Sequence, residues 1–145
     1  MKIKIVRLNK DVNLPVYKTD GAACMDLESA EDRVIKPNEI AYIKTGLIIY
    51  TPKGHVMVIA PRSSTPKRGL AMPHSVALVD PDYCGPEDET FIQLKNITDK
   101  DIEIKKGERT AQFFFIKKPE VEWEEIDYKT ITSNKSRGGF GSTGH

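Results

Sequence analysis

The sequence predicts an all-β protein whose strands close into a sandwich or barrel. Apolar and polar residues alternate with a period of two through most of the chain, as they do in strands with one buried face. Turn residues separate these segments at short intervals, and no segment shows the i, i+3, i+4, i+7 spacing of an amphipathic helix. Many short strands divided in this way are typical of closed β-architectures.

Six segments carry the strand pattern, and a seventh, shorter strand is expected at Val121–Ile126. In chain order the six are Lys2–Leu8, Ile40–Tyr50, His55–Ala60, Thr90–Asn96, Asp101–Ile104 and Thr110–Lys117. The turns that bound them are rich in Pro, Gly, Asn and Asp, as in Lys36-Pro37-Asn38, Thr51-Pro52-Lys53-Gly54, Thr98-Asp99-Lys100 and Lys106-Gly107. One short helical turn is expected within Ser63–Gly69, with a serine as its N-cap and Pro66 near its first turn.

Length and composition indicate one globular domain. The 145 residues suit a single core, and 39% hydrophobic with 30% charged residues argues against a disordered chain. Hydrophobic periodicity is lost only near the C-terminus, so we predict a domain at residues 1–132 and a flexible C-terminal arm at residues 133–145. That arm lacks the apolar residues needed to join the core, so it is either disordered or ordered by a ligand.

Charge and targeting signals exclude several partners and locations. The formal net charge of +1 provides no global field that attracts nucleic acid or an anionic membrane, so we expect neither as a partner. The start, MKIKIVRL, lacks the apolar core of a signal peptide, and no apolar run is long enough to span a bilayer. Two cysteines, Cys24 and Cys84, are too few for a disulfide framework. Together these observations predict a cytoplasmic protein with reduced thiols.

Two polar clusters offer groups that suit a metal or a phosphate. Residues Ala22–Glu28 place Asp26 among small and apolar residues, as a ligand carboxylate or simply as an outward-facing group at the start of a strand. Residues Pro61–Gly69 combine consecutive hydroxyls with Arg62, Lys67 and Arg68, which suits an anion nest. The same composition also suits a solvated basic loop, and the residues alone leave both interpretations open.

Two further clusters suit a base and its surroundings. Asp80 follows an apolar run directly and precedes Tyr83, as a fixed base near a flat ring does, although Asp80-Pro81-Asp82 is also a common β-turn. The segment 106–112, KGERTAQ, enters a very apolar strand, and its Arg109 and Gln112 are either turn residues or ligand contacts.

In this order, the clusters and the C-terminal stretch resemble the five short motifs of the trimeric dUTP pyrophosphatase (dUTPase) family. The matches run through nearly the whole chain: AACMDL at 22–27, PRSS at 61–64, VDPDYCG at 79–85, KGERTAQ at 106–112 and RGGFGSTG at 137–144. The longer loops that follow PRSS and Tyr83-Cys84-Gly85 are similar to the phage and Bacillus-type branch of this family.

The resemblance implies a fold, an assembly and a reaction. The fold would be a distorted jelly-roll (β-clip) barrel, and the assembly a homotrimer with active sites at subunit interfaces and a C-terminal arm that crosses to a neighbour's site. The reaction would be Mg²⁺-dependent hydrolysis of dUTP to dUMP and pyrophosphate by attack of water on the α-phosphorus. Such an enzyme limits uracil incorporation into DNA and supplies dUMP for dTMP synthesis.

The resemblance also implies roles for individual residues. Asp80 would activate the attacking water, Tyr83 would stack under the deoxyribose, and Asp26 would reach Mg²⁺ through water. The implied phosphate ligands are Arg62, Ser63 and Ser64, with a serine hydroxyl near the scissile bond. The other implied substrate contacts are His74, Leu78, Val79, Arg109, Gln112, Arg137 at the γ-phosphate, Phe140 over the uracil, Gly141, Ser142 and Thr143.

Elementary chemistry agrees with these roles. A carboxylate is ionised at neutral pH, so Asp80 can accept a proton from water. The leaving group is pyrophosphate, which needs charge neutralisation more than protonation, and Mg²⁺ together with arginine supplies it. Mg²⁺ keeps several of its waters in proteins, which suits contact with Asp26 through water.

Departures from the family pattern leave base selectivity open. His74 stands where the family commonly has asparagine, Ala77 stands where it has glycine, and Cys84 stands where it has arginine. The histidine can still donate or accept a hydrogen bond, whereas the alanine adds a methyl group near the base. Discrimination among dUTP, dCTP and dTTP is therefore not determined by the motifs.

Alternative functions on the same scaffold remain. A dCTP deaminase carries a glutamate where this chain has Gln93, and an amide cannot shuttle the proton that attack on C4 requires. Hydrolysis of both dUTP and dCTP stays open. A non-catalytic nucleotide sensor could lose Asp80 or Arg137, and both are present, which favours an active hydrolase.

Overall fold

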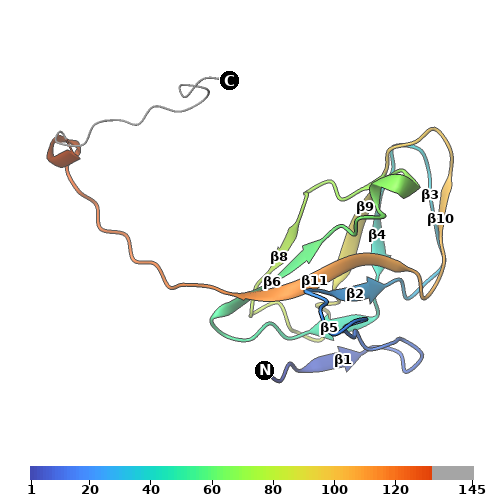
Figure 1. Ribbon diagram of the computed structural model, residues 1–145, viewed down its shortest axis with the longest axis horizontal. Helices are drawn as coiled ribbons and strands as arrows, with labels where there is room; N and C mark the ends of the chain where they lie inside the picture. The colour runs from blue at the N-terminus through green and yellow to red at the C-terminus, as the bar shows by residue number, and fades with distance from the viewer. Residues whose placement is uncertain (132–145) are drawn as a thin grey trace.

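The structure is a computed structural model that describes residues 1–131, and strands dominate it (Figure 1). Within these residues there is no α-helix, so the all-β prediction is confirmed. The strands are β1 (Ile5–Arg7), β2 (Met25–Glu28), β3 (Arg33–Ile35), β4 (Ile40–Lys44), β5 (Leu47–Ile49), β6 (His55–Ala60), β7 (Leu70–Ala71), β8 (Ala77–Val79), β9 (Phe91–Asn96), β10 (Ile102–Ile104) and β11 (Arg109–Lys117). Two short 3₁₀ turns complete the description, η1 (Pro66–Arg68) and η2 (Tyr128–Ile131).

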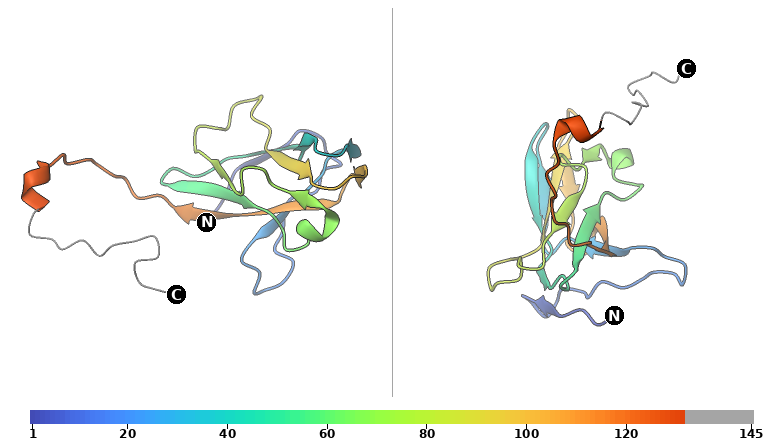
Figure 2. Two further views of the ribbon diagram at one scale, coloured as in Figure 1. Left: turned by 90° about the horizontal axis from the view of Figure 1, so that it is seen from above. Right: turned by 90° about the vertical axis from the view of Figure 1, so that its left-hand side faces the viewer.

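The strands form four small antiparallel sheets around one core. The largest has the order β2-β11-β6-β8, the next β4-β9-β7, and two-stranded pairs are made by β1-β5 and β10-β3. The two larger sheets lie on opposite sides of the barrel (Figure 2), and both send side chains into the same core. That core includes Leu27, Met57 and Phe113 from the first sheet and Ile43 and Leu94 from the second.

Alternation of buried and exposed residues explains why the apolar–polar pattern of the sequence located several strands. In β4 exposed and buried residues alternate strictly, and β9 follows the same rule. Each buried Leu, Ile or Phe side chain contributes about 1.5–3 kcal/mol to folding, so this register is strongly specified. The predictions at His55–Ala60, Thr90–Asn96, Asp101–Ile104 and Thr110–Lys117 are confirmed to within one residue at each end, and Lys2–Leu8 shortens to β1.

The single strand predicted at Ile40–Tyr50 is wrong, because the structure has two strands there, β4 and β5. Ile40–Tyr50 breaks at Thr45-Gly46, where Gly46 has φ of 67° and a Cβ in its place would lie 2.6 Å from Val12 Cγ2. The bend carries no polar turn signal because all of its residues are buried. The strands β2, β3, β7 and β8 were not predicted as such, since two to four residues are too short to display a period.

The predicted helical turn is present as η1, but its N-cap differs. Thr65 occupies the N-cap rather than a serine, and no side chain caps the turn. The Thr65 hydroxyl instead accepts a hydrogen bond from the Arg62 backbone N–H at 3.0 Å, within the loop that precedes η1. Gly69 ends the turn with φ of 72°.

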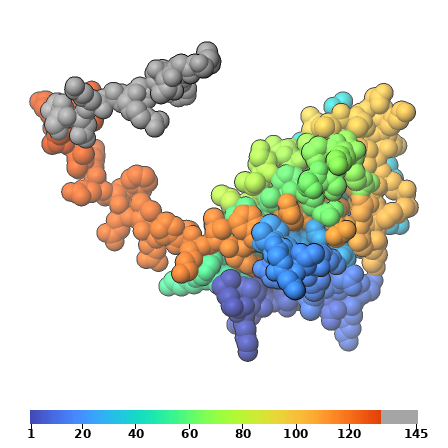
Figure 3. All heavy atoms as spheres, in the orientation of Figure 1, coloured from blue at the N-terminus to red at the C-terminus, as the bar shows by residue number. Residues whose placement is uncertain are grey.

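Residues 118–131 leave the barrel and extend away from it (Figures 1 and 3). The strand predicted at Val121–Ile126 is wrong, since this stretch has no regular structure and no neighbouring strand to pair with in the described chain. Its large apolar side chains are exposed, and Trp123 is 94% exposed. The arm predicted at 133–145 lies outside the described residues. Among residues 1–131, no helix is both long and apolar enough to cross a membrane.

Candidate active site

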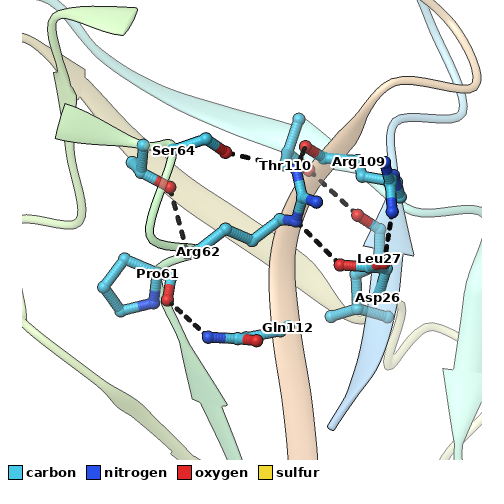
Figure 4. Close-up of polar contacts among 9 residues, drawn as sticks. Asp26, Leu27, Pro61, Arg62, Ser64, Arg109, Thr110 and Gln112 are labelled. Carbon is cyan, nitrogen blue, oxygen red and sulfur yellow. Dashed lines mark hydrogen bonds and ion pairs between the residues drawn. The ribbon is translucent and has the colours of Figure 1, made fainter. Parts of the chain in front are cut away.

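Five of the expected site residues gather in one cluster, which we call the arginine cluster: Asp26, Arg62, Ser64, Arg109 and Gln112 (Figure 4). Three neighbouring strands position them. Gln112 on the central strand β11 pairs in register with Asp26 on β2 and with Ala60 at the end of β6. Arg62 follows Ala60 by two residues, so strand pairing alone brings these side chains to one level of the sheet.

Asp26 is the centre of the arginine cluster. Its Oδ1 accepts a hydrogen bond from Arg62 Nε at 2.8 Å, and its Oδ2 accepts one from Arg109 Nη1 at 3.1 Å. Its side chain is only 14% exposed, so the carboxylate orients both guanidinium groups in a partly desolvated place. Arg62 Nη1 also donates to Ser64 Oγ and to the Arg109 carbonyl, both at 3.3 Å. Two positive groups and one negative group meet here, which leaves a net positive site.

A β-bulge brings Arg109 into this position. Arg109 pairs with Glu28 and Ala111 pairs with Leu27, so Thr110 is an extra residue between them. Thr110 and Ala111 are consecutively buried, which breaks the alternation of β11 at this point. Bulges re-aim side chains and are common beside active sites. Here the bulge lies immediately next to the arginine whose guanidinium reaches Asp26.

The loop after β6 is fixed by its own polar contacts. Gln112 Nε2 donates to the Pro61 carbonyl at 2.9 Å, and Thr65, which is buried, holds the Arg62 backbone. Sequence reasoning missed Thr65 as a support of this loop, although its place directly after two serines is a signal for a hydroxyl–backbone turn. Ser63 is exposed and bonds to no other residue in the described part of the chain. Such free hydroxyls and N–H groups beside arginines suit an anion.

Arg68, which the sequence suggested for the same nest, points elsewhere. It pairs with the Glu108 carboxylate and donates to the Glu103 carbonyl at 2.8 Å. Lys67 is exposed and makes no ion pair within residues 1–131. The positive charge of the cluster therefore comes from Arg62 and Arg109.

The other predicted residues surround a separate hollow, which we call the hairpin pocket. It has a volume of about 460 Å³ and is formed by β8 and the turns on either side of it, together with residues of β4, β6 and β9. Its lining residues are Tyr42, Ile59, His74, Val76, Ala77, Leu78, Val79, Asp80, Tyr83, Thr90, Phe91 and Gln93. The pocket thus brings together five of the predicted site residues: His74, Leu78, Val79, Asp80 and Tyr83.

Asp80 begins a β-turn. The Tyr83 N–H donates to the Asp80 carbonyl at 3.2 Å, and Pro81 supplies the fixed φ that favours such a turn. The β-turn that the sequence offered as one alternative is therefore present. Before this turn, the Thr51 hydroxyl donates to the Val79 carbonyl at 3.3 Å and fixes the end of β8. The Asp80 carboxylate is exposed and within reach of solvent.

Tyr83 offers a ring face to the pocket. Its side chain is 39% exposed, and its hydroxyl donates to the Glu89 carbonyl at 2.9 Å. Desolvation, followed by the negative charges of Asp88 and Glu89, raises the pKa of Tyr83 above its ordinary value of 10.0. The hydroxyl therefore remains a hydrogen-bond donor throughout the neutral range.

The opposite side of the pocket is less constrained. His74 is exposed in a turn where Ser75 has φ of 63°, and the side chain of Leu78 is 65% exposed. On the pocket wall, Thr90 Oγ1 is buried without a hydrogen-bond partner among the described residues. Gln93 lies on the same wall. Sequence reasoning had no signal for Thr90, because its place at the pocket depends on the pairing of strands distant in sequence.

Arg62 of the arginine cluster and Asp80 of the hairpin pocket lie at opposite ends of β6. Met57 pairs with Val79, so Asp80 is level with the beginning of β6, whereas Arg62 follows its end. The six residues of β6 rise by roughly 20 Å. The remaining predicted residues, Arg137, Phe140, Gly141, Ser142 and Thr143, lie outside the described residues.

The donor set fits Mg²⁺ only through water. Residues 1–131 contain no group of three or more His, Cys, Asp or Glu that could hold a metal ion. Asp26 is the carboxylate of the arginine cluster, and each of its oxygens already accepts from an arginine. A carboxylate oxygen has about two acceptor positions, so each still has one for a metal-bound water.

Comparisons with known proteins give a consistent result. A family model described as dUTPase matches residues 10–144. A protein named deoxyuridine 5'-triphosphate nucleotidohydrolase from Hydrogenobaculum is 37% identical over 147 residues, covering 99% of both chains. A crystal structure of the dUTPase from Streptococcus mutans is 32% identical with a TM-score of 0.78, covering 85% of this chain and 100% of that one. The dUTPase of Staphylococcus bacteriophage 80alpha with dUPNHPP, 24% identical with 99% of both chains covered, has the same fold with a TM-score of 0.85.

Proposed function

The chain belongs to the dUTPase family, and from this premise we propose how its residues carry out the hydrolysis of dUTP to dUMP and pyrophosphate. The observation that carries the proposal is the arginine cluster, where two guanidinium groups meet at Asp26 beside serine hydroxyls. Such a constellation matches the oxygens of a phosphate chain in charge and in donor geometry.

The hairpin pocket would take the base and the sugar. Its volume is suited to a nucleoside, and its lining mixes apolar side chains with a few polar groups, as small-molecule sites do. The exposed face of Tyr83 would lie under the deoxyribose, leaving no room for a ribose 2′-hydroxyl. Leu78, Val79 and His74 would line the edge of the base.

Asp80 would be the general base. Its carboxylate is accessible to water at the rim of the hairpin pocket, and its backbone is fixed by the turn that also carries Tyr83. A base must lie within hydrogen-bond reach of the water it activates, so the rim of the sugar site is the appropriate place. The water would attack the α-phosphorus and Asp80 would accept its proton.

The arginine cluster would hold the triphosphate. Arg62, Ser63 and Ser64 would contact its oxygens, while Asp26 keeps the guanidinium groups oriented before substrate arrives. Arg109 and Gln112 would contact phosphate or its ordered waters. Because these donors are already arranged, little reorganisation is needed when negative charge develops on the pyrophosphate leaving group. Arg137, Phe140, Gly141, Ser142 and Thr143 would complete the substrate contacts, with Arg137 at the γ-phosphate.

Mg²⁺ fits this arrangement as an ion carried by the phosphates, with Asp26 accepting hydrogen bonds from its waters. When bound, it would neutralise charge on the phosphate oxygens. Asp26 would at the same time hold Arg62 and Arg109, so one carboxylate orients both kinds of positive charge.

A homotrimer with shared sites is the assembly we propose. Asp80 and Arg62 are separated by the length of β6, and a base acting on a water reaches only about 3 Å. One chain therefore does not bring both groups to one phosphorus, and a second copy would supply the missing half. The exposed apolar segment of residues 118–131 supports contact with another copy, because Trp123 is left without a partner on its own barrel. We also propose a cytoplasmic location, supported by the two free thiols Cys24 and Cys84.

The alternative functions differ in the nucleobase that is accepted and in whether any reaction is catalysed. Gln93 lies in the hairpin pocket where a deaminase would need a carboxylate, so deamination is disfavoured. Hydrolysis of dCTP beside dUTP remains a second candidate because His74 and Ala77 both line this pocket. A non-catalytic sensor would bind nucleotide without turnover.

One substrate panel tests the proposal. Pyrophosphate release is measured from dUTP, dCTP, dTTP and UTP with Mg²⁺, together with nucleotide binding by calorimetry. We expect rapid release from dUTP and far slower release from UTP. Binding of dUTP without any pyrophosphate release would overturn the hydrolase in favour of the sensor.

A further inference from the structure

We propose that Glu89 is a positioning residue that fixes the ring of Tyr83 and thereby determines how strictly the site distinguishes deoxyribose from ribose. This inference rests on the proposed function of Tyr83 as the sugar platform. Glu89 belongs to none of the motifs discussed above, and it lies in the loop between the Asp80 turn and β9.

The ring of Tyr83 is held at both ends. Its backbone N–H closes the turn on the Asp80 carbonyl, and its hydroxyl donates to the Glu89 carbonyl at 2.9 Å. Between these two attachments the ring remains 39% exposed, so one face is free for a sugar. The position of the Glu89 backbone therefore sets how far the ring can move when a bulkier sugar presses on it.

The Glu89 side chain is one of the restraints on that backbone. Its Oε1 accepts a hydrogen bond from the Gly46 N–H at 2.8 Å. Gly46 is buried in the bend between β4 and β5, where an unpaired N–H is costly, and a carboxylate acceptor makes this bond stronger than a neutral one. Glu89 thus links a surface loop to a buried bend of the barrel.

The bend itself has little freedom. Thr45 and Leu47 are buried, Thr45 Oγ1 donates to the Thr90 carbonyl at 2.6 Å, and the Thr90 N–H donates to the Leu47 carbonyl at 2.8 Å. Gly46 has φ of 67°, and a Cβ at this position would meet Val12 at 2.6 Å. Residues 45–47 therefore hold residues 89 and 90 through three hydrogen bonds.

Loss of the Glu89–Gly46 bond would affect the discrimination between deoxyribose and ribose, and not the hydrolysis step itself. The site excludes the 2′-hydroxyl of ribose only if the Tyr83 ring, which occupies the space that this hydroxyl would need, does not move. The Glu89 carbonyl shares its peptide group with the Thr90 N–H, which stays bonded to Leu47, so releasing the Glu89 side chain from Gly46 would loosen this carbonyl without freeing it. The Tyr83 hydroxyl, which donates to the carbonyl, would follow that movement. The Tyr83 ring could then shift to admit the ribose of UTP and would contact the deoxyribose of dUTP less closely. Asp80 would stay in place.

The test is the ratio of kcat/KM for dUTP to kcat/KM for UTP, measured by pyrophosphate release with Mg²⁺. Glu89→Ala is expected to lower this ratio about tenfold, the value of one charge-assisted hydrogen bond. Glu89→Gln keeps the reach and an acceptor oxygen and should stay near the wild-type ratio. Glu89→Asp keeps the charge but falls short of Gly46, so it should resemble Glu89→Ala. Glu87→Ala is the matched control, because Glu87 is exposed in the same loop and its side chain bonds to nothing within residues 1–131.

A double-mutant cycle distinguishes positioning from general stability. Tyr83→Phe removes the hydroxyl that Glu89 holds, so adding Glu89→Ala to Tyr83→Phe should change the ratio no further. An unchanged ratio in Glu89→Ala, or an additional loss in the double variant, would overturn the inference. Where Glu89→Ala does not fold, the comparison of Glu89→Gln with Glu89→Asp decides in the same way. Absence of dUTP hydrolysis in the wild type would instead refute the proposed function itself.

Discussion

Arg62 and Asp80 lie at opposite ends of a single strand, β6. Arg62 follows the last residue of the strand by two positions, whereas the pairing of Met57 with Val79 puts Asp80 level with Val56, the second residue of the strand. The two groups that we propose to act on one phosphate chain are therefore separated by roughly 20 Å within one chain. This separation makes the sharing of active sites between copies directly testable.

Mixed trimers of two inactive variants should regain activity. Arg62→Ala removes the phosphate half of each site and Asp80→Asn removes the base, so each homogeneous preparation should be nearly inactive. After the two are unfolded and refolded together at equal amounts, about one quarter of the sites would combine two intact halves in a cyclic trimer. Pyrophosphate release should therefore rise to about one quarter of the wild-type rate.

The control is the same mixture made without unfolding, which should remain inactive while subunits do not exchange. A refolded mixture that forms trimers by light scattering and still lacks activity would mean that both halves must come from one chain.

Asp80→Asn should abolish turnover and leave binding largely intact. The amide has nearly the same shape as the carboxylate, so the turn closed by Tyr83 should persist, but it cannot accept the proton of the attacking water. We expect kcat to fall by a factor on the order of 10³ or more. Stopped-flow turnover and calorimetric dUTP binding measure the two effects separately. Near-wild-type turnover would refute Asp80 as the base.

Arg62→Lys should be far from conservative. Arg62 bonds through Nε to Asp26 and through Nη1 to Ser64 and to the Arg109 carbonyl, and one ammonium group cannot reproduce this fork. We expect kcat/KM for dUTP to fall by a factor on the order of 10². Lys67→Ala, an exposed change in the same loop, serves as the control and should stay near wild type. Equal effects of the two changes would indicate a general charge effect in place of a fixed geometry.

Tyr83 should ionise only at high pH. Desolvation and the nearby charges of Asp88 and Glu89 raise its pKa above 10.0. Below pH 10 the ring is protonated in both folded and unfolded chains, so it contributes no pH dependence there. Above pH 10 the unfolded chain ionises first, and the free energy of unfolding should fall as pH rises through the folded-state pKa.

Ultraviolet titration of the wild type and Tyr83→Phe checks this point. The tyrosinate signal that is missing from the variant should appear at a higher pH than that of a free tyrosine amide. A missing signal centred below pH 10 would contradict the burial and charge environment of the ring.

The sequence predicted the longer strands that have turns at both ends and missed most of the short ones. His55–Ala60 and Thr110–Lys117 could be located because their apolar residues have turns at both ends. Ile40–Tyr50 was joined into one strand because the bend at Gly46 is buried and carries no polar signal. Val121–Ile126 resembled a strand because it alternates, yet alternation without a neighbouring strand forms no sheet.

Motif resemblance predicts the candidate site residues but not their arrangement. Motif resemblance identified Asp26, Arg62 and Asp80, and strand register then grouped the first two and separated the third. The contacts that support these residues were not predictable. Thr65 holds the Arg62 backbone and Glu89 holds the Tyr83 hydroxyl, each through a single hydrogen bond. Such bonds depend on three-dimensional distances that leave no periodic pattern in the sequence.

Truncation before Arg137 should separate folding from catalysis. Among the described residues, those of the core all lie within 12–113, so a chain that ends at residue 136 retains every one of them and should fold with little loss of stability. It would lack Arg137, whose guanidinium we expect at the γ-phosphate, and Phe140, which we expect over the uracil. Because charge-assisted contacts to phosphate are strong, kcat/KM for dUTP should fall by a factor on the order of 10² or more.

Arg137→Ala in the full chain is the matched single change, and it should account for much of the loss while the melting temperature stays constant. Unchanged kinetics in both variants would mean that Asp80 and the arginine cluster suffice for the reaction, and that the RGGFGSTG stretch contributes nothing to the site.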